Sequence, residues 1–141
     1  MAKADISANA RNLDHIGIIV PDLEASMAMF ETLLGVAPKL KELPDLGLRI
    51  AEFQAKNIGI ELLCYSGEAK FARDTMGDVM GLNHIAIEVD DVAAARDHFA
   101  AQGLTPQPGF PRQGAHGEVL FFDRVMPANM LIELCKPDSA V

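Results

Sequence analysis

The sequence predicts an α+β domain in which one β-α-β-β-β unit occurs twice. A segment that reads LDHIGIIVPDL over residues 13–23 recurs as LNHIAIEVDDV over residues 82–92. Each copy continues into a helical pattern that stops at a glycine, and each half ends in a glutamate-containing strand, Ile60–Leu63 or Ile132–Cys135. Because a segment repeated in this way indicates a duplicated unit, we interpret residues 1–141 as a single domain with modules over about 12–65 and 81–136.

The first module contains one well-defined helix. Asp22 is a favourable N-cap, and Gly35 suits the left-handed residue that ends many helices. Between them, apolar side chains recur at helical spacing on one face: Leu23, Met27, Phe30 and Leu34. The elements predicted after this helix are strands at Pro38–Lys41, Leu46–Gln54 and Ile58–Leu63 and a short connecting helix at Ser66–Met76.

The second module repeats this order. Asp90 or Asp91 caps its helix, and Gly103 ends it. The apolar face of this helix consists of Val92, Ala95 and Phe99. Its strands are predicted at Leu104–Gln107, Val119–Asp123 and Met130–Cys135. This order of elements favours mainly antiparallel pairing.

Composition excludes several classes of function. A net charge of −8 argues against a nucleic-acid-binding surface, which needs clustered Lys and Arg. No apolar run approaches the ~20 residues that span a bilayer, and the opening residues lack the apolar stretch of a secretory signal. The two cysteines, Cys64 and Cys135, form neither a disulfide framework nor a metal-binding pair. We therefore expect a cytoplasmic protein without a nucleic-acid or membrane partner.

Each recurring strand carries a histidine opposite its aliphatic face. Side chains alternate between the two faces of a strand, so the aliphatic residues share one face, which we expect to pack against the following helix. His15 then points to the other side, and Gly17, two positions on, leaves room there. His84 and Ala86 repeat this pattern in the second module.

The closing strands add one glutamate each. Glu61 and Glu133 lie between aliphatic neighbours on the face that points away from the helices, where an unpaired carboxylate is costly. A lone strand histidine or glutamate is usually hydrogen-bonded or solvated, but two such pairs at repeat-equivalent positions favour one shared site. Two imidazoles and two carboxylates give a neutral site around a divalent ion. We therefore predict that one ion is bound by His15, Glu61, His84 and Glu133.

These motifs resemble a known superfamily. The recurring segments at residues 15–23 and 82–91 are similar to the vicinal oxygen chelate superfamily. Within it, Ile60–Leu63, the GAHG loop at residues 114–117 and Leu131–Leu134 are most similar to methylmalonyl-CoA epimerases. The resemblance implies two modules side by side in a curved, eight-stranded sheet around a metal. It also places the four predicted ligands at the metal positions of the epimerase pattern. The ion it implies is cobalt, or alternatively manganese, zinc or nickel, and the assembly it implies is a homodimer.

The resemblance further implies epimerisation of methylmalonyl-CoA or a related 2-substituted acyl-CoA. A metal chelated by two carbonyl oxygens stabilises the enolate that forms when the C2 proton leaves. Acid–base groups on opposite faces of that carbon then exchange the proton. The resemblance assigns one face to Glu133. The second catalytic glutamate of the family matches Ile50 here, so Glu52, two residues on and on the same strand face, is the candidate for the other face.

Three residues near the GAHG loop are candidates for substrate binding. Gly114 and His116 belong to the loop itself, where His116 is either a substrate or proton-donating group or a solvent-facing turn residue. Arg112, next to the loop, is the candidate contact for a phosphate of CoA.

Other functions are open at this stage. A glyoxalase-like lyase acting on a thiol adduct is a second enzymatic possibility. A non-catalytic small-molecule binder is a further alternative, although binders in the superfamily commonly lack the full ligand set that this chain retains. A ring-cleaving dioxygenase fits less well, because it needs a three-ligand site with positions open to oxygen and typically a longer chain.

Overall fold

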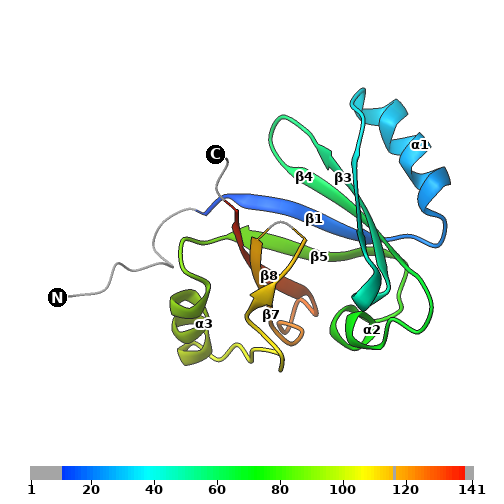
Figure 1. Ribbon diagram of the computed structural model, residues 1–141. Helices are drawn as coiled ribbons and strands as arrows, with labels where there is room; N and C mark the ends of the chain where they lie inside the picture. The colour runs from blue at the N-terminus through cyan, green and yellow to red at the C-terminus, as the bar shows by residue number, and fades with distance from the viewer. Residues whose placement is uncertain (1–10, 116, 139–141) are drawn as a thin grey trace.

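The computed structural model describes residues 11–115 and 117–138 (Figure 1). In chain order its elements are β1 (Leu13–Ile19), α1 (Leu23–Leu34), β2 (Lys39–Leu43), a 3₁₀ turn (Pro44–Leu46), β3 (Leu48–Gln54), β4 (Gly59–Tyr65), α2 (Lys70–Met76), β5 (Gly81–Glu88), α3 (Val92–Ala101), β6 (Arg112–Gln113), β7 (Gly117–Phe121) and β8 (Leu131–Pro137). Within the described residues, no helix is long and apolar enough to cross a membrane.

The strands form one sheet whose order reflects the internal repeat. The strand order is β2-β3-β4-β1-β5-β8-β7-β6. From the central pair outward, the first half has the order β1, β4, β3, β2 and the second half has the equivalent order β5, β8, β7, β6. The pairs β1–β4 and β5–β8 are parallel, and the other neighbours are antiparallel. Figure 1 shows the sheet curling between the two halves. The predicted α+β fold with a curved, eight-stranded and mainly antiparallel sheet is confirmed.

Two helices cover the outer face of the sheet. Helix α1 packs on β3 and β4, and α3 packs on β7 and β8, at opposite ends of the molecule (Figure 1). Both begin at the predicted caps, where Asp22 accepts from Ala25 N and Asp91 accepts from Ala94 N, each at 3.0 Å. Gly35 ends α1 in the left-handed conformation with φ 70°. Ile18 and Val20 belong to the same apolar cluster as the buried face of α1, and Ile87 and Val89 to that of α3, as predicted.

The inner face of the sheet holds a separate apolar cluster. Its buried members are Ile19, Leu48, Ile50, Leu63, Ala69, Ala72, Met76, Phe121 and Leu131. Helix α2 contributes to this cluster and so lies on the inner side. Ile19, Leu63 and Leu131 share strand parity with the predicted ligands. The predicted metal ligands therefore lie on the same side of the sheet as α2.

The structure corrects three predicted elements. Leu104–Gln107 is not a full strand: it makes a single bridge, Pro106 with Phe122, which is flanked by hydrogen bonds from Gln107 N to Phe121 O at 2.8 Å and from Asp123 N to Thr105 O at 2.7 Å. The short strand β6 pairs with β7 instead. The connecting helix begins only at Lys70, since Gly67 and Ala69 have positive φ. Strand β3 begins at Leu48, since Leu46 belongs to the 3₁₀ turn.

Candidate metal site

The two histidines lie close together on β1 and β5, the two paired strands at the centre of the sheet. Gly17 on β1 pairs with His84 on β5, and Ala86 on β5 pairs with His15. A Cβ atom built at Gly17 would overlap the His84 ring. We predicted that Gly17 leaves room for His15, the histidine of its own strand. The structure shows that Gly17 makes room for His84, the histidine of the other half.

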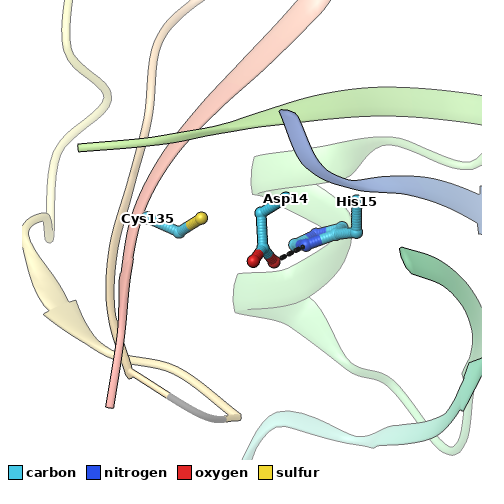
Figure 2. A group of neighbouring side chains, drawn as sticks. All are labelled: Asp14, His15 and Cys135. Carbon is cyan, nitrogen blue, oxygen red and sulfur yellow. Dashed lines mark hydrogen bonds and ion pairs between the residues drawn. The ribbon is translucent and has the colours of Figure 1, made fainter. Parts of the chain in front are cut away.

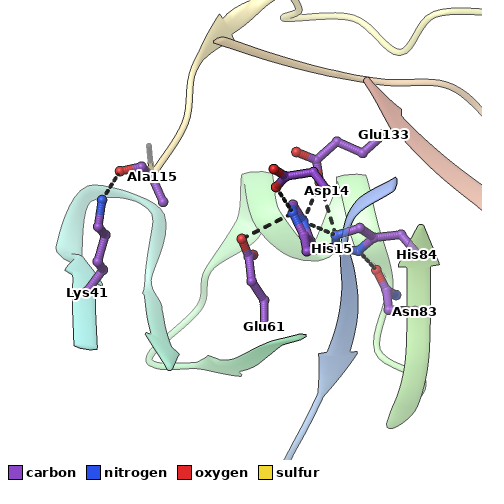
Figure 3. Close-up of polar contacts among 8 residues, drawn as sticks. All are labelled: Asp14, His15, Lys41, Glu61, Asn83, His84, Ala115 and Glu133. Atoms are coloured by element: carbon purple, nitrogen blue, oxygen red, sulfur yellow. Dashed lines mark hydrogen bonds and ion pairs between the residues drawn. The ribbon is translucent and has the colours of Figure 1, made fainter. Parts of the chain in front are cut away.

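Three donor atoms converge at this point (Figure 3). His15 Nε2 and His84 Nε2 lie 3.4 Å apart. Glu133 Oε1 lies 3.3 Å from His15 Nε2 and 3.0 Å from His84 Nε2. The three residues are 3–5% exposed. Two imidazole nitrogens and a carboxylate oxygen at one buried point are a donor set that suits a divalent transition metal.

Glu61, the fourth predicted ligand, lies beside this point. Its carboxylate contacts His15 on the opposite edge of the ring, with Oε2 3.5 Å from Nδ1. Figure 3 shows Glu61 on one side of His15, with His84 and Glu133 on the other. The structure thus brings all four residues to one buried cluster, with three of them sharing the point at the Nε2 atoms.

The residue before each histidine fixes the direction of its ring. His15 Nδ1 donates to Asp14 Oδ2 at 2.7 Å, and His84 Nδ1 donates to Asn83 Oδ1 at 2.8 Å. Asn83 Nδ2 donates in turn to the carbonyl of Met76 at 2.8 Å. Because that carbonyl can only accept, the amide oxygen faces His84, which therefore carries its proton on Nδ1. Both Nε2 atoms are left to bind a metal, the usual role of such hydrogen bonds behind metal ligands.

We did not predict from the sequence that Asp14 and Asn83 orient the histidine rings, although the sequence contains a pattern that indicates it. Both are polar, and they occupy equivalent positions in the repeat, directly before the histidines. Strict alternation would place Asp14 on the face opposite His15. A shift in the β1–β5 register between Leu13 and His15 marks an irregularity that brings the Asp14 side chain to the ring instead.

The charged and hydrogen-bonding groups of the cluster shift the pKa values of His15 and Glu133 in opposite directions. Burial lowers the pKa of His15, but the hydrogen bond to Asp14 and the charges of Glu133 and Glu61 outweigh it and raise that pKa well above its usual value. Burial raises the pKa of Glu133, but the adjoining His15 and His84 rings outweigh it and hold that pKa well below its usual range. Because metal ligands must be deprotonated, a divalent cation bound here would compete with the proton that these carboxylates favour on His15.

A second group of donor types shares His15. Asp14, His15 and Cys135 have donor atoms within 4.8 Å of one another, and Figure 2 shows the thiol pointing toward Asp14. Burial and the charges of Glu133 and Asp14 raise the pKa of the Cys135 thiol, which keeps it protonated. A thiol binds metals as the thiolate, and His15 Nδ1 is already engaged by Asp14. The group at the Nε2 atoms is therefore the better metal site.

A cavity opens next to the converging donors. It measures about 720 Å³, counting the space that opens to solvent, and its wall includes Glu61, His84 and Glu133. Ile50 is 3% exposed and lines this cavity. Glu52 lies directly across from Glu61 in the β3–β4 ladder and lines a neighbouring hollow with His15 and Glu61.

The candidate substrate-binding residues lie at the other side of this cavity. Arg112 and Gly114 both line it. Lys41 of the edge strand β2 donates to the carbonyl of Ala115 at 2.5 Å, so the loop of the second half is tied to the first half (Figure 3). His116 lies outside the described residues.

Comparisons with known proteins agree with this fold. The family model for the glyoxalase/bleomycin resistance protein/dioxygenase superfamily matches residues 14–122. An ethylmalonyl-CoA/methylmalonyl-CoA epimerase from Cereibacter sphaeroides is 36% identical over 78% of this chain and 85% of its own length. A hypothetical protein from Bacillus halodurans superposes with a TM-score of 0.80 at 24% identity, covering 94% of this chain and 99% of that one.

A methylmalonyl-CoA epimerase from Mycobacterium tuberculosis gives a TM-score of 0.76 at 25% identity, covering 91% of this chain and 89% of that one. The family match spans most of the chain, and the Cereibacter relative covers a similar share of it. The chain therefore belongs to the glyoxalase/bleomycin resistance protein/dioxygenase superfamily, as its repeated motifs predicted.

Proposed function

We propose that the protein is a divalent-metal-dependent isomerase that epimerises C2 of methylmalonyl-CoA or a related 2-substituted acyl-CoA. The observation that carries this proposal is the convergence of His15, His84 and Glu133 on one buried point in the wall of a cavity. The 36% identity to an epimerase over most of the chain supports the same enzyme class.

His15, His84 and Glu133 would hold the ion, and Glu61 would complete the set by turning from His15 Nδ1. The ion is cobalt or another divalent transition metal. When bound, it supplies Lewis acidity that stabilises the enolate of the chelated thioester and carboxylate.

The residues of the chain would move the proton. Glu133 borders the cavity and exchanges a proton with C2 on one face. Glu52 serves the other face: it sits on β3 across from Glu61, half-buried at the edge of the neighbouring hollow. The apolar wall around the reacting carbon excludes water, so the enolate is reprotonated by these carboxyl groups.

Binding of the CoA portion falls to the second half of the chain. Arg112 would meet a phosphate, and the loop with Gly114 and His116 would lie along the thioester. We further propose that the protein is a homodimer, which its sedimentation velocity would establish.

Solvent exchange tests the proposed reaction. Metal-loaded protein incubated with methylmalonyl-CoA in deuterated water should place deuterium at C2, detected by mass spectrometry or NMR. Binding of the thioester without exchange would leave a non-catalytic binder as the better description.

Glu52→Gln tests the second acid–base group. The variant should keep its metal, because Glu52 is not a ligand, and lose exchange by about 10²–10⁴-fold. Glu118→Gln, an exposed glutamate on β7, is the matched control and should exchange at the normal rate. Normal exchange in Glu52→Gln would remove Glu52 from the mechanism.

A further inference from the structure

Three phenylalanines form a continuous row along the cavity wall, from the metal cluster to the edge of the sheet. The Phe121 ring lies edge-on to the His84 ring, with centroids 5.1 Å apart. Phe110 lies 5.7 Å from Phe121, and Phe71 lies 5.7 Å from Phe110. We call Phe71, Phe110 and Phe121 the aromatic row. All three line the cavity that His84 and Glu133 border.

The aromatic row is assembled from three separate elements. Phe71 lies on α2, Phe110 precedes β6, and Phe121 ends β7, at the β7–β8 pairing position of Glu133. Aliphatic side chains from β3 and β4 complete the wall: Leu48, Ile50 and Leu63. Phe71 and Phe110 are only half-buried, so their rings present apolar surface to the cavity.

Charged groups stand at the two ends of the aromatic row. Glu61, His84 and Glu133 form the metal end. At the other end the Arg112 guanidinium stacks on Phe71, with Cζ 4.4 Å from the ring centroid. Apart from these charged groups, the uncharged hydrogen-bonding side chains that line the cavity, among the residues that the structure describes, are Thr75 and Gln113, and Gln113 lies next to Arg112. The wall beside the row therefore offers few partners for hydrogen bonds.

This wall suits one part of the substrate better than the others. The pantetheine arm of CoA carries amides, and burying an amide without hydrogen-bond partners is costly. A C2 methyl group would cover little of a row of three rings. An alkyl or arylalkyl group on C2, next to the oxygens held at the metal, would bury apolar surface against the row, and offset stacking would favour an aromatic ring there.

We propose that the aromatic row binds the C2 substituent of the substrate, an inference that rests on the proposed function. We further infer that this substituent is apolar and larger than methyl. The substrate class is then 2-alkyl- or 2-arylalkyl-malonyl thioesters of CoA. Ile50 is part of this specificity, because it is 3% exposed and supplies an aliphatic side chain to the wall of the cavity that Glu133 borders.

A substrate series tests the proposal. Deuterium exchange at C2 is measured on metal-loaded protein with methyl-, ethyl-, butyl- and benzylmalonyl-CoA. We expect kcat/KM to rise along the series, with about a tenfold gain from methyl to ethyl, since one methylene in an apolar pocket is worth about 10–200-fold. Highest kcat/KM for the methyl compound would overturn this proposal and leave the proposed function standing. No exchange with any thioester would overturn both.

Two variants assign the preference to the aromatic row. Phe71→Leu and Phe110→Leu should each lower the ratio of benzyl to methyl kcat/KM by about tenfold, because the rings contribute stacking and area. Phe30→Leu is the matched control: Phe30 is also half-buried and packs on another ring, Phe53, but under α1 on the outer face. Its ratio should stay unchanged. A ratio that is unaffected in both cavity variants would contradict the proposal.

Discussion

The two halves of the chain hold their histidines in the same geometry but with different partners. In the first half the ring is oriented by a carboxylate, Asp14, which is partly open to solvent. In the second half the ring is oriented by an amide, Asn83, which is buried and hydrogen-bonded to Met76. The duplicated unit has thus kept the direction of the Nε2 atoms while the charge behind each ring has diverged.

A physical reason underlies this difference. An aspartate at position 83 would place a carboxylate oxygen against the carbonyl of Met76, two acceptors at hydrogen-bond distance, so the buried position requires a donor. Asp14 meets no such restriction in its half-exposed position. Met76 is the last residue of α2, which lines the cavity. Asn83 therefore connects the wall of the cavity to His84, whereas Asp14 adds negative charge behind His15.

Removing a histidine should have the largest effect on the site. His84→Ala takes away one of the three converging donors, and we expect metal binding to be lost while the fold persists, since the helix-packing face of β5 is unchanged. Elemental analysis measures this. His98→Ala, on α3 of the outer layer, is the control and should bind metal normally. Full metal content in His84→Ala would exclude His84 as a ligand.

Gly17 and Ala86 are equivalent in the repeat, yet they should not be interchangeable. Gly17→Ala would place a methyl group in the His84 ring, so the ring must move. We expect a loss of about 1–3 kcal/mol in unfolding free energy, as for overpacked cores, together with weaker metal binding. Ala86→Gly, the reverse change in the other half, should keep its metal affinity. Equal affinity in the two variants, measured by calorimetry, would refute the crosswise fit of the histidines.

Loss of the Asn83 side chain should weaken the site less than loss of a ligand. Asn83→Ala frees His84 to adopt the other tautomer, and a partner behind a metal ligand is typically worth about 10–100-fold in affinity. In zinc-loaded protein, ¹⁵N NMR of the histidine rings reports which nitrogen is bound. Asn83→Asp keeps an acceptor for His84 but not the donor to Met76, so it should lose more thermal stability than Asp14→Asn. Unchanged zinc affinity in Asn83→Ala would remove its positioning role.

The smallest effect is expected for Asp14→Asn. The amide oxygen can still accept from His15 Nδ1, so orientation is retained and only the charge behind the ring is lost. Zinc affinity should fall less than in Asp14→Ala, for which about 10–100-fold is expected. Asp90→Ala, an exposed aspartate outside the site, is the control. Equal losses in Asp14→Asn and Asp14→Ala would mean that charge, and not ring orientation, is what Asp14 contributes.

The sequence predicted the features that follow from periodic patterns. The fold class followed from the repeat, and the inner placement of His15 and Glu133 followed from strand alternation. The strand predicted at Leu104–Gln107 is reduced to a single bridge, Pro106 with Phe122, with one ladder hydrogen bond on each side. The apolar spacing indicated an extended segment there but not how far its pairing would continue.

Other features depended on local irregularity or on long-range packing. Asp14 reaches His15 because the β1–β5 register shifts beside it. The contact of Glu61 with Nδ1 rather than Nε2 depends on the turn of a ring that no pattern specifies. The aromatic row joins α2, a loop and β7, three segments that are not adjacent in the sequence.

A crystal structure of the cobalt-loaded protein, with anomalous scattering to locate the metal, tests the central claim most directly. We predict one ion bound by His15 Nε2, His84 Nε2 and a Glu133 oxygen at about 2.0–2.3 Å, with Glu61 turned toward it. His15 Nδ1 and His84 Nδ1 should still donate to Asp14 and Asn83. An ion on Asp14 and Cys135, or any of the three ligands facing away from the metal, would contradict the account.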